Sequence, residues 1–320
     1  MELSVIIVSW NCSEELKLCL GSLRAALAGM DAETIVIDNA SSDGTPGMVR
    51  ELFPEVRLVA NRDNRGFAAA NNQGIGLGGG EYLLLLNPDA VLSASAVEGL
   101  LGFMRSVPEA GAAGPAFSPS AGLPPRIRPG IYRFPRAKDE LLLDTFLGDL
   151  ASLLAGLARR RGRAPAAEPS SGPVETHWIS GACMLVRRKA AEAAGPLDER
   201  FFLYMEELEW CYRLRLAGWK VFVLPGVGVV HTGGASSSKL SGAHISALFY
   251  ESRYKYFAKH WPRGAVLLLR AAKAGLMAVT LLLTLPACLL PGAAGTGARS
   301  RAAGTAAVLP VVLGLRPARR

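Results

Sequence analysis

The first hundred residues alternate between two hydrophobic periodicities, and this alternation restricts the possible folds more than any other feature. Short runs of β-branched and apolar residues are separated by longer segments with the 3.6-residue period of an amphipathic helix. We expect strands at 3–9, 33–38, 56–60 and 81–86, and helices at 13–28, 45–52, 67–77 and 93–106. Strands that alternate with helices in this way predict a mostly parallel, doubly wound, Rossmann-like α/β sheet.

The strand predicted at 81–86 ends in the acidic tripeptide Asn87-Pro88-Asp89. Polar residues at the carboxyl end of such a strand lie where open α/β sheets bind their ligands. We therefore predict that Asp89 holds a hard divalent cation, Mg²⁺ or Mn²⁺, which favours oxygen ligands and phosphate groups. The alternative is an ordinary turn in which Asp89 caps the helix that starts near Ser93.

A second acidic stretch, Glu206-Glu207-Leu208-Glu209, opens a helix that we expect over 203–217. Within that helix Glu207 shares a side with Cys211 and Leu214, so its carboxylate lies on a partly apolar face. A crowded carboxylate has a raised proton affinity, which suits a general base. The alternative is a solvated acidic first turn that the helix dipole favours.

Three further residues stand at predicted strand ends. His231 follows the last expected strand, 221–224, and is placed to reach a metal or a phosphate, or to serve a structural role. Asp38 ends the second strand and can accept a hydrogen bond from a pyrimidine ring N–H. Trp10 follows the first strand and can stack on that ring. Plain packing is the alternative for both Asp38 and Trp10.

Between the acidic stretches the chain is rich in Pro, Gly and Ala. We expect an irregular insert over 108–175 that contains an amphipathic helix near 138–158 and a mobile loop at 159–173. Order should resume with a strand near 176–186 and a helix near 188–194. The predicted catalytic domain covers residues 1–260.

The tail over 261–320 is hydrophobic and basic. Residues 274–291 contain no charged side chain and approach the roughly 20 residues that cross a bilayer. We expect a membrane-associated helical tail; a buried core helix is the alternative. Residues 302–315 are short for a span. Because basic residues flank both ends of 274–291, the orientation stays open, and so do a re-entrant hairpin and an in-plane anchor.

The net charge of +8 indicates an anionic partner. Basic residues are not interleaved with aromatics and no zinc-finger or RNA-recognition motif occurs, so we expect no nucleic-acid partner. The five cysteines form no C-x-x-C pair, as expected for buried, reduced thiols. The amino terminus lacks the features of a signal peptide. We expect the protein at the cytoplasmic face of the inner membrane.

Six segments in order resemble the family-2 glycosyltransferases of the GT-A fold, and most closely the rhamnosyltransferase-like branch that builds bacterial cell-surface polysaccharides. The segments are VIIVSWN (5–11), IDNASSDGT (37–45), NRGFAAANNQGI (64–75), LLLNPDA (84–90), SGACMLVRR (180–188) and DERFFLYMEELEWCYRLRLAGW (198–219). The resemblance extends over about residues 3–260. It implies a nucleoside-diphosphate-sugar donor and an inverting mechanism.

Carried over to this chain, the resemblance makes Glu207 the catalytic base, Asp89 the last acid of the family's D-x-D motif, and His231 a second group at the metal. Asn87 departs from the pattern because it replaces the first acid of that motif, and Glu207 departs because Asp is commoner at the base. The expected acceptor side comprises Gly181 and Glu206. The expected donor-binding residues are Val8, Trp10, Asn11, Asp38, Asn39, Asn64, Gly66 and Asn87.

The expected activity is transfer of a sugar, rhamnose or a related hexose, from a dTDP- or UDP-sugar to a hydroxyl of a saccharide or lipid-linked saccharide. A sugar-1-phosphate nucleotidyltransferase is a weaker alternative, because residues 10–13 lack the glycine and lysine of its phosphate loop. A non-catalytic alternative is a membrane-bound subunit that binds sugar nucleotides or scaffolds a polysaccharide assembly complex.

Overall fold

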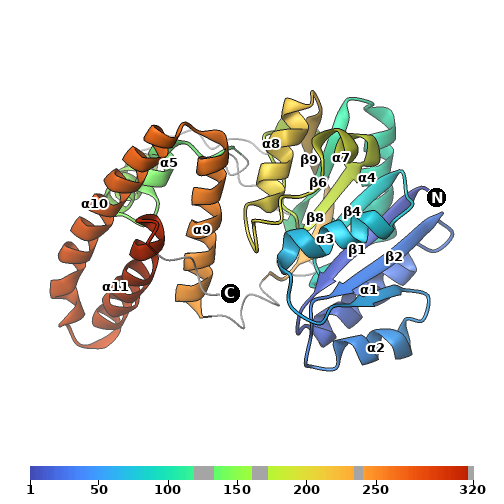
Figure 1. Cartoon of the computed structure of the whole chain (residues 1–320), viewed down its shortest axis with the longest axis horizontal. Helices are drawn as coiled ribbons and strands as arrows, with labels where there is room; N and C mark the ends of the chain where they lie inside the picture. The colour runs from blue at the N-terminus through green and yellow to red at the C-terminus, as the bar shows by residue number, and fades with distance from the viewer. Residues whose placement is uncertain (119–132, 161–171, 234–240, 316–320) are drawn as a thin grey trace. The chain divides into compact units, whose positions relative to one another are not determined.

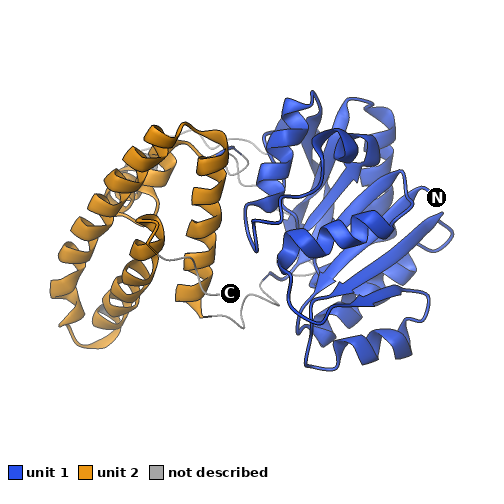
Figure 2. Ribbon diagram, viewed as in Figure 1, with its two compact units in different colours: residues 1–134, 169–239 blue, residues 135–168, 240–320 orange. Residues whose placement is uncertain are grey.

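The computed structural model describes residues 1–118, 133–160, 172–233 and 241–315. They form two compact units. The first comprises residues 1–134 and 169–239, and the second comprises residues 135–168 and 240–320 (Figure 2). The chain therefore leaves the first unit, returns to it and leaves it again. The predicted catalytic domain, 1–260, has different bounds from the first unit, because the contacts of residues 240–260 lie within the second.

A mixed sheet with the strand order β3-β2-β1-β4-β8-β6-β9-β5 forms the centre of the first unit, and β7 also pairs with β9 (Figure 1). The first four strands in the chain are parallel, as predicted, whereas β8 is antiparallel to both of its neighbours. The strands are β1 Leu3–Ser9, β2 Ala32–Asp38, β3 Arg57–Ala60, β4 Tyr82–Leu86, β5 Ala90–Val91, β6 Ala110–Ser118, β7 Val174–Thr176, β8 Cys183–Arg187 and β9 Lys220–His231.

Helices cover both faces of this sheet. Buried side chains of α1, α2 and α4 pack on one face, and those of α3, α7 and α8 pack on the other. The helices are α1 Ser13–Ala26, α2 Thr45–Leu52, α3 Gly66–Leu77, α4 Ala94–Ser106, α7 Arg188–Ala194 and α8 Glu206–Leu216. Because the sheet is buried on both faces, β1 and β4 are apolar along most of their length rather than alternating.

The strand register brings several chain segments to one edge of the sheet. Ser9 pairs with Asp38, so the residues after β1 and β2 are neighbours. Leu86 at the end of β4 pairs with Cys183 at the start of antiparallel β8, which places the residues after β4 beside those before β8. This edge is the carboxyl end of the parallel strands, where ligands of open α/β sheets bind.

The predicted irregular insert, 108–175, is wrong at its start, because residues 110–118 form the buried strand β6. Its mobile loop, 159–173, lies mostly outside the described residues. The predicted strand 221–224 is part of the longer β9, which continues to His231. The helix predicted near 138–158 is two helices, and residues 242–260 form a helix that we did not predict.

The second unit is helical and consists of α5 Ala137–Leu142, α6 Phe146–Arg160, α9 Gly242–His260, α10 Arg263–Cys288 and α11 Gly292–Val312. Its interior holds a charged group: the Glu140 carboxylate accepts a hydrogen bond of 2.6 Å from Arg253 Nε. The ammonium of the buried Lys273 on α10 donates to the Glu140 carbonyl oxygen at 2.8 Å. These contacts join α5, α9 and α10.

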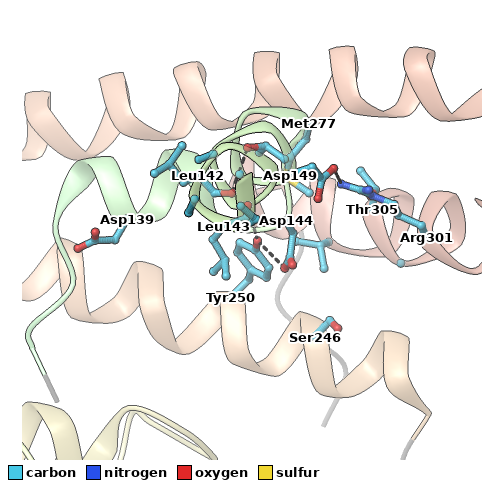
Figure 3. Close-up of a pocket in the computed structure, with 18 residues that line it drawn as sticks. Asp139, Leu142, Leu143, Asp144, Asp149, Ser246, Tyr250, Met277, Arg301 and Thr305 are labelled. Atoms are coloured by element: carbon cyan, nitrogen blue, oxygen red, sulfur yellow. Dashed lines mark hydrogen bonds and ion pairs between the residues drawn. The ribbon is translucent and has the colours of Figure 1, made fainter. Parts of the chain in front are cut away.

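Within the described residues α10 is long and apolar enough to cross a membrane, judged by its length and composition alone. Only 28% of its most apolar window is buried, which disfavours the alternative of a core helix. A cavity of about 1000 Å³ also lies in the second unit (Figure 3). Residues of all five helices line it, and none of the predicted site residues does.

Candidate active site

The Asn87-Pro88-Asp89 tripeptide is fixed between β4 and the two-residue strand β5. The Asn87 amide N–H donates to the Ala182 carbonyl oxygen at 2.9 Å, and Ala90 pairs with His231 of β9. Asp89 is buried, with 6% of its surface exposed. The alternative role for Asp89, as a helix cap, is wrong: Ser93 caps α4, and its Oγ accepts from the Ala96 N–H.

The pairing of β5 with β9 brings three predicted site residues together. His231 Nε2 lies 3.1 Å from Asp89 Oδ1 and 3.2 Å from Asn87 Nδ2. The imidazole also packs on Phe117, with ring centroids 5.5 Å apart. His231 is more than 140 positions from both Asn87 and Asp89 in the chain, so the fold brings the three residues together.

The donor atoms of this cluster match a divalent cation. With ligands about 2.1 Å from an octahedral cation, two neighbouring donors lie about 3 Å apart, close to the 3.1 Å between Asp89 Oδ1 and His231 Nε2. An unprotonated Nε2 can accept from the Asn87 amide, but it then faces a carboxylate oxygen without a proton between them. A cation held by both atoms would remove that repulsion, and the single Nε2 lone pair would then point to the cation in place of the Asn87 amide.

The protein donors are few. Among the described residues, no group of three or more His, Cys, Asp and Glu side chains is arranged to hold a metal ion. Asp89 and His231 would therefore provide only a partial coordination shell for a cation. Mg²⁺ and similar ions are commonly bound in this way, through one or two carboxylates together with water and substrate phosphates.

Glu206 and Glu207 begin α8 after two residues in an unusual conformation. Tyr204 and Met205 have φ values of +69° and +71°, in the left-handed region that costs a non-glycine residue about 1–3 kcal/mol. The helix consequently starts at Glu206 and not at 203 as predicted. Such strain at a functional site fixes where the first helical side chains lie.

Glu206 is buried and Glu207 is partly exposed, so the alternative of a fully solvated first turn is wrong. Glu206 has 3% of its surface exposed, and one oxygen of each carboxyl is buried without a hydrogen-bond partner. Burial raises the pKa of Glu206 well above its usual value, and the nearby Glu207 charge raises it further. Burial also raises the pKa of Glu207, partly offset by backbone N–H groups, including that of Gly181.

Gly181 links the two acidic stretches. A Cβ on Gly181 would lie 3.5 Å from the Glu207 Cβ, so the Gly181 backbone packs on this side chain, and its N–H lowers the pKa of the Glu207 carboxyl. The next residue, Ala182, accepts the Asn87 N–H. One short segment before β8 therefore contacts both the tripeptide after β4 and the first turn of α8.

Asp38 fixes the predicted donor-binding loops after β1 and β2. Its buried carboxylate accepts from Ser9 Oγ at 3.1 Å and from the Ser41 N–H at 2.9 Å. Asn11, at φ +49°, accepts from the Ser42 N–H at 2.7 Å through its side-chain oxygen. Val8, at the end of β1, is 9% exposed, and Trp10 is partly exposed.

Asn39, Asn64 and Gly66 form a second connected group. The buried Asn39 side chain donates to the Gly66 carbonyl oxygen at 3.1 Å, and Asn64 accepts from the Gly66 N–H at 3.0 Å. Gly66 has φ +81°, and a Cβ there would lie 2.6 Å from the Phe202 carbonyl oxygen. The loop before α3 therefore packs directly on the segment that leads into α8.

The sequence reasoning missed Ser9, Ser41 and Phe202, which position predicted site residues. For Ser9 a signal existed, because it is the last residue of β1 and pairs with Asp38 in a parallel register. The Phe202 contact has no local signal, since the chain separates it from Gly66 by more than 130 residues.

Comparison with known proteins identifies the family. The model of the family described as "Glycosyl transferase family 2" matches residues 4–194, which is more than half of the chain. The chain belongs to glycosyl transferase family 2. The matched region contains the loops after β1 and β2, the Asn87-Pro88-Asp89 tripeptide and Gly181.

Curated relatives of this family 2 glycosyltransferase cover most of its length. An N-acetylglucosaminyl-diphospho-decaprenol L-rhamnosyltransferase of Mycobacterium tuberculosis is 29% identical over 272 residues, 80% of this chain and 84% of the relative. A low-salt glycan biosynthesis hexosyltransferase, Agl10, of Haloferax volcanii is 26% identical over 259 residues, 79% of this chain and 74% of the relative. These relatives support sugar transfer in polysaccharide synthesis.

A solved structure shows the same fold. The mannosyltransferase PcManGT of Pyrobaculum calidifontis, in complex with GDP-Man and Mn²⁺, aligns with a TM-score of 0.57 at 18% identity, covering 98% of this chain and 86% of the other. The predicted α/β sheet of GT-A type is therefore confirmed.

Proposed function

We propose that this family 2 glycosyltransferase is an inverting, metal-dependent enzyme that transfers rhamnose or a related hexose from a dTDP- or UDP-sugar. The proposed acceptor is a hydroxyl of a saccharide or lipid-linked saccharide in cell-surface polysaccharide synthesis. The observation that carries the proposal is the segment 180–182, which contacts both the Asn87-Pro88-Asp89 tripeptide and Glu207. It connects the acid that we propose to hold the cation with the acid that we propose to accept the proton.

In the proposed reaction, Glu207 removes the proton of the acceptor hydroxyl as that oxygen attacks the anomeric carbon. A raised pKa suits this role, because a general base works best when its pKa is near the operating pH. One Glu207 oxygen is buried and has no hydrogen-bond partner, and we propose that the Glu207 carboxylate takes up that proton. A single displacement inverts the configuration at the anomeric carbon.

Asp89 and His231 are proposed to hold the Mg²⁺ or Mn²⁺ ion. When bound, a divalent cation neutralises the charge that develops on the departing nucleoside diphosphate. Asn87 Nδ2 lies 3.2 Å from the same His231 Nε2, so Asn87 is proposed to border the cation site. The Mn²⁺ in the structure of the archaeal mannosyltransferase supports the choice of ion.

The remaining predicted residues are proposed to bind the substrates. Gly181 and Glu206 lie beside the base, on the proposed acceptor side. The loops that Asp38 and Asn39 fix are proposed to enclose the nucleotide, with Trp10 against its base. Because both Asp38 oxygens already accept hydrogen bonds, we expect it mainly to hold the loop. The proposed donor-binding residues are Val8, Trp10, Asn11, Asp38, Asn39, Asn64, Gly66 and Asn87.

A panel of nucleotide sugars tests the proposal, with released nucleoside diphosphate as the readout. We expect the enzyme to turn over one dTDP- or UDP-linked sugar. Release of the nucleoside diphosphate should require Mg²⁺ or Mn²⁺ and should not be detected with the Glu207→Gln enzyme. Donor hydrolysis in the absence of acceptor separates a catalyst from a sugar-nucleotide-binding subunit. Unchanged turnover in EDTA, or in Glu207→Gln, would contradict the assigned roles.

A further inference from the structure

Helices α10 and α11 form an antiparallel hairpin in the second unit (Figure 1). Near its open end, Arg270 Nη1 donates to the Val311 and Val312 carbonyl oxygens at 2.9 and 2.7 Å. Near the turn, Arg299 Nη1 donates to the Cys288 carbonyl oxygen at 2.8 Å. These contacts fix which residues of the two helices lie at the same level.

The closed end of this hairpin, residues 282–298, is apolar and exposed. No charged residue occurs from position 274 to position 298. Leu289 is 87% exposed, and the other exposed leucines of this end are Leu282, Leu283, Leu285 and Leu290. Exposed apolar clusters of this kind mark interaction sites.

The charges on the two arms limit how deeply this end can enter a bilayer. The arm of α10 is uncharged from Ala274 to Cys288, about 21 Å at 1.5 Å per residue. The arm of α11 is uncharged only from Gly292 to Ala298, about 9 Å, before Arg299 and Arg301. The hydrocarbon core is about 30 Å thick, and one leaflet is about half of that. A crossing α10 would carry Arg301 as well as Arg299 into the core at a high cost.

Helix α6 provides an independent sign of a lipid surface. Its exposed leucines follow the i, i+3, i+4, i+7 spacing of an amphipathic helix, at positions 150, 153, 154 and 157. Asp149 in its first turn pairs with Arg301 of α11, and Figure 3 shows α6 crossing α10 and α9 rather than running along them. An amphipathic helix at the level of Arg301 lies in the plane of the membrane–water interface when the axes of α10 and α11 are perpendicular to the membrane.

We propose that the α10–α11 hairpin is a one-leaflet wedge. Residues 282–298 enter the hydrocarbon of one leaflet, and Arg301 and α6 stay at the headgroup level. The Arg299 guanidinium goes in with the closed end, where it donates to the Cys288 carbonyl oxygen and to Thr296 Oγ1. Both ends of the hairpin then remain on the side of the membrane that the first unit occupies. The inference goes beyond the proposed reaction, and its test does not require activity.

Binding of the full-length protein to phosphatidylcholine–phosphatidylglycerol vesicles tests the wedge. Leu289→Lys should lower partitioning into the vesicles by about tenfold or more, because it removes a leucine side chain that the bilayer buries. Leu18→Lys on α1, an exposed leucine of the first unit at 67%, adds the same charge and should leave partitioning unchanged. Equal binding of wild type and Leu289→Lys would overturn the proposal, and so would equal losses in both variants.

A probe on Cys288 measures the depth. The other four cysteines are buried, and burial raises the pKa of Cys183 and Cys211 to about 12, so a maleimide fluorophore should label Cys288 selectively. We expect quenching by nitroxide lipids and none by an impermeant quencher trapped inside the vesicles. Quenching from the lumen would show a spanning helix and would overturn the wedge, as would the absence of nitroxide quenching.

Discussion

The buried Glu206 and Glu207 pair predicts that one substitution moves activity and stability in opposite directions. Glu207→Gln keeps the size of the side chain and removes its negative charge. Turnover should fall by about 10²–10⁴-fold, the usual contribution of a general base, while affinity for the donor stays nearly unchanged. At neutral pH the same variant should be more stable than wild type.

The size of the stability gain follows from the burial of the pair. Glu207 Oε2 is buried without a partner; a Gln amide stays unpartnered there, so the gain comes from removing the buried charge. Burial raises the pKa of both Glu206 and Glu207, and each unit of such a shift is worth about 1.4 kcal/mol. A gain of about 1–3 kcal/mol raises Tm by roughly 2–12 °C for a domain of this size.

The stability difference between Glu207→Gln and wild type depends on pH in a direction that follows from the raised pKa. A carboxyl whose folded pKa lies above its unfolded value of about 4.3 binds more protons in the folded state, so stability falls as the pH rises between the two values. The Tm of Glu207→Gln should therefore match that of wild type near pH 4 and exceed it increasingly toward the raised folded pKa. Thermal unfolding followed by circular dichroism from pH 4 to pH 8 measures this difference.

Glu14→Gln is a matched control for the same chemical change. Glu14 lies exposed in the first turn of α1, where its charge favours the helix dipole, so its loss should cost about 0.3–1 kcal/mol. A Glu207→Gln protein with a lower Tm than wild type at pH 8 would refute the reasoning from buried charge. Turnover equal to that of wild type would remove Glu207 from the mechanism.

Three further substitutions test other parts of the site. Asp89→Ala should abolish the EDTA-sensitive part of nucleotide binding in calorimetry; identical isotherms with and without EDTA in wild type would contradict this. Gly66→Ala should lower the unfolding free energy by at least about 1–2 kcal/mol, since φ is +81° and a backbone oxygen lies within 2.6 Å, whereas Gly21→Ala in open space on α1 should stabilise slightly. Glu209→Ala breaks the buried pair with Arg213 and should cost about 3–5 kcal/mol in denaturant unfolding; a loss below 1 kcal/mol would show that the pair is unimportant.

The first half of the sheet could be predicted from the sequence because each element there has a strong local signal. Apolar runs such as 82–86 are buried on both faces and are bounded by Gly80 and Pro88. Strand β6 has no such signal, because alanine, glycine and proline favour strands poorly. It forms because small residues allow close packing: a Cβ on Gly111 would lie 2.6 Å from the Trp219 Cβ.

The contacts among the candidate site residues could not be predicted from the sequence. Asp89 and His231 each have a local signal at a strand end, yet their 3.1 Å approach depends on β5, which is only two residues long. Burial of the Glu206 carboxyl could not be predicted either. It depends on the left-handed Tyr204 and Met205, a conformation that these residue types do not favour.

The division of the second unit along the chain has a consequence for its biogenesis. Helix α5 leaves the ribosome long before its partner, since Glu140 and Arg253 are 113 positions apart. At about 5–20 residues per second, the guanidinium arrives roughly 6–23 s after the carboxylate. During that interval α5 and the leucine-rich α6 are nascent segments without their helical neighbours. We expect translation to finish before this half of the molecule becomes resistant to proteases.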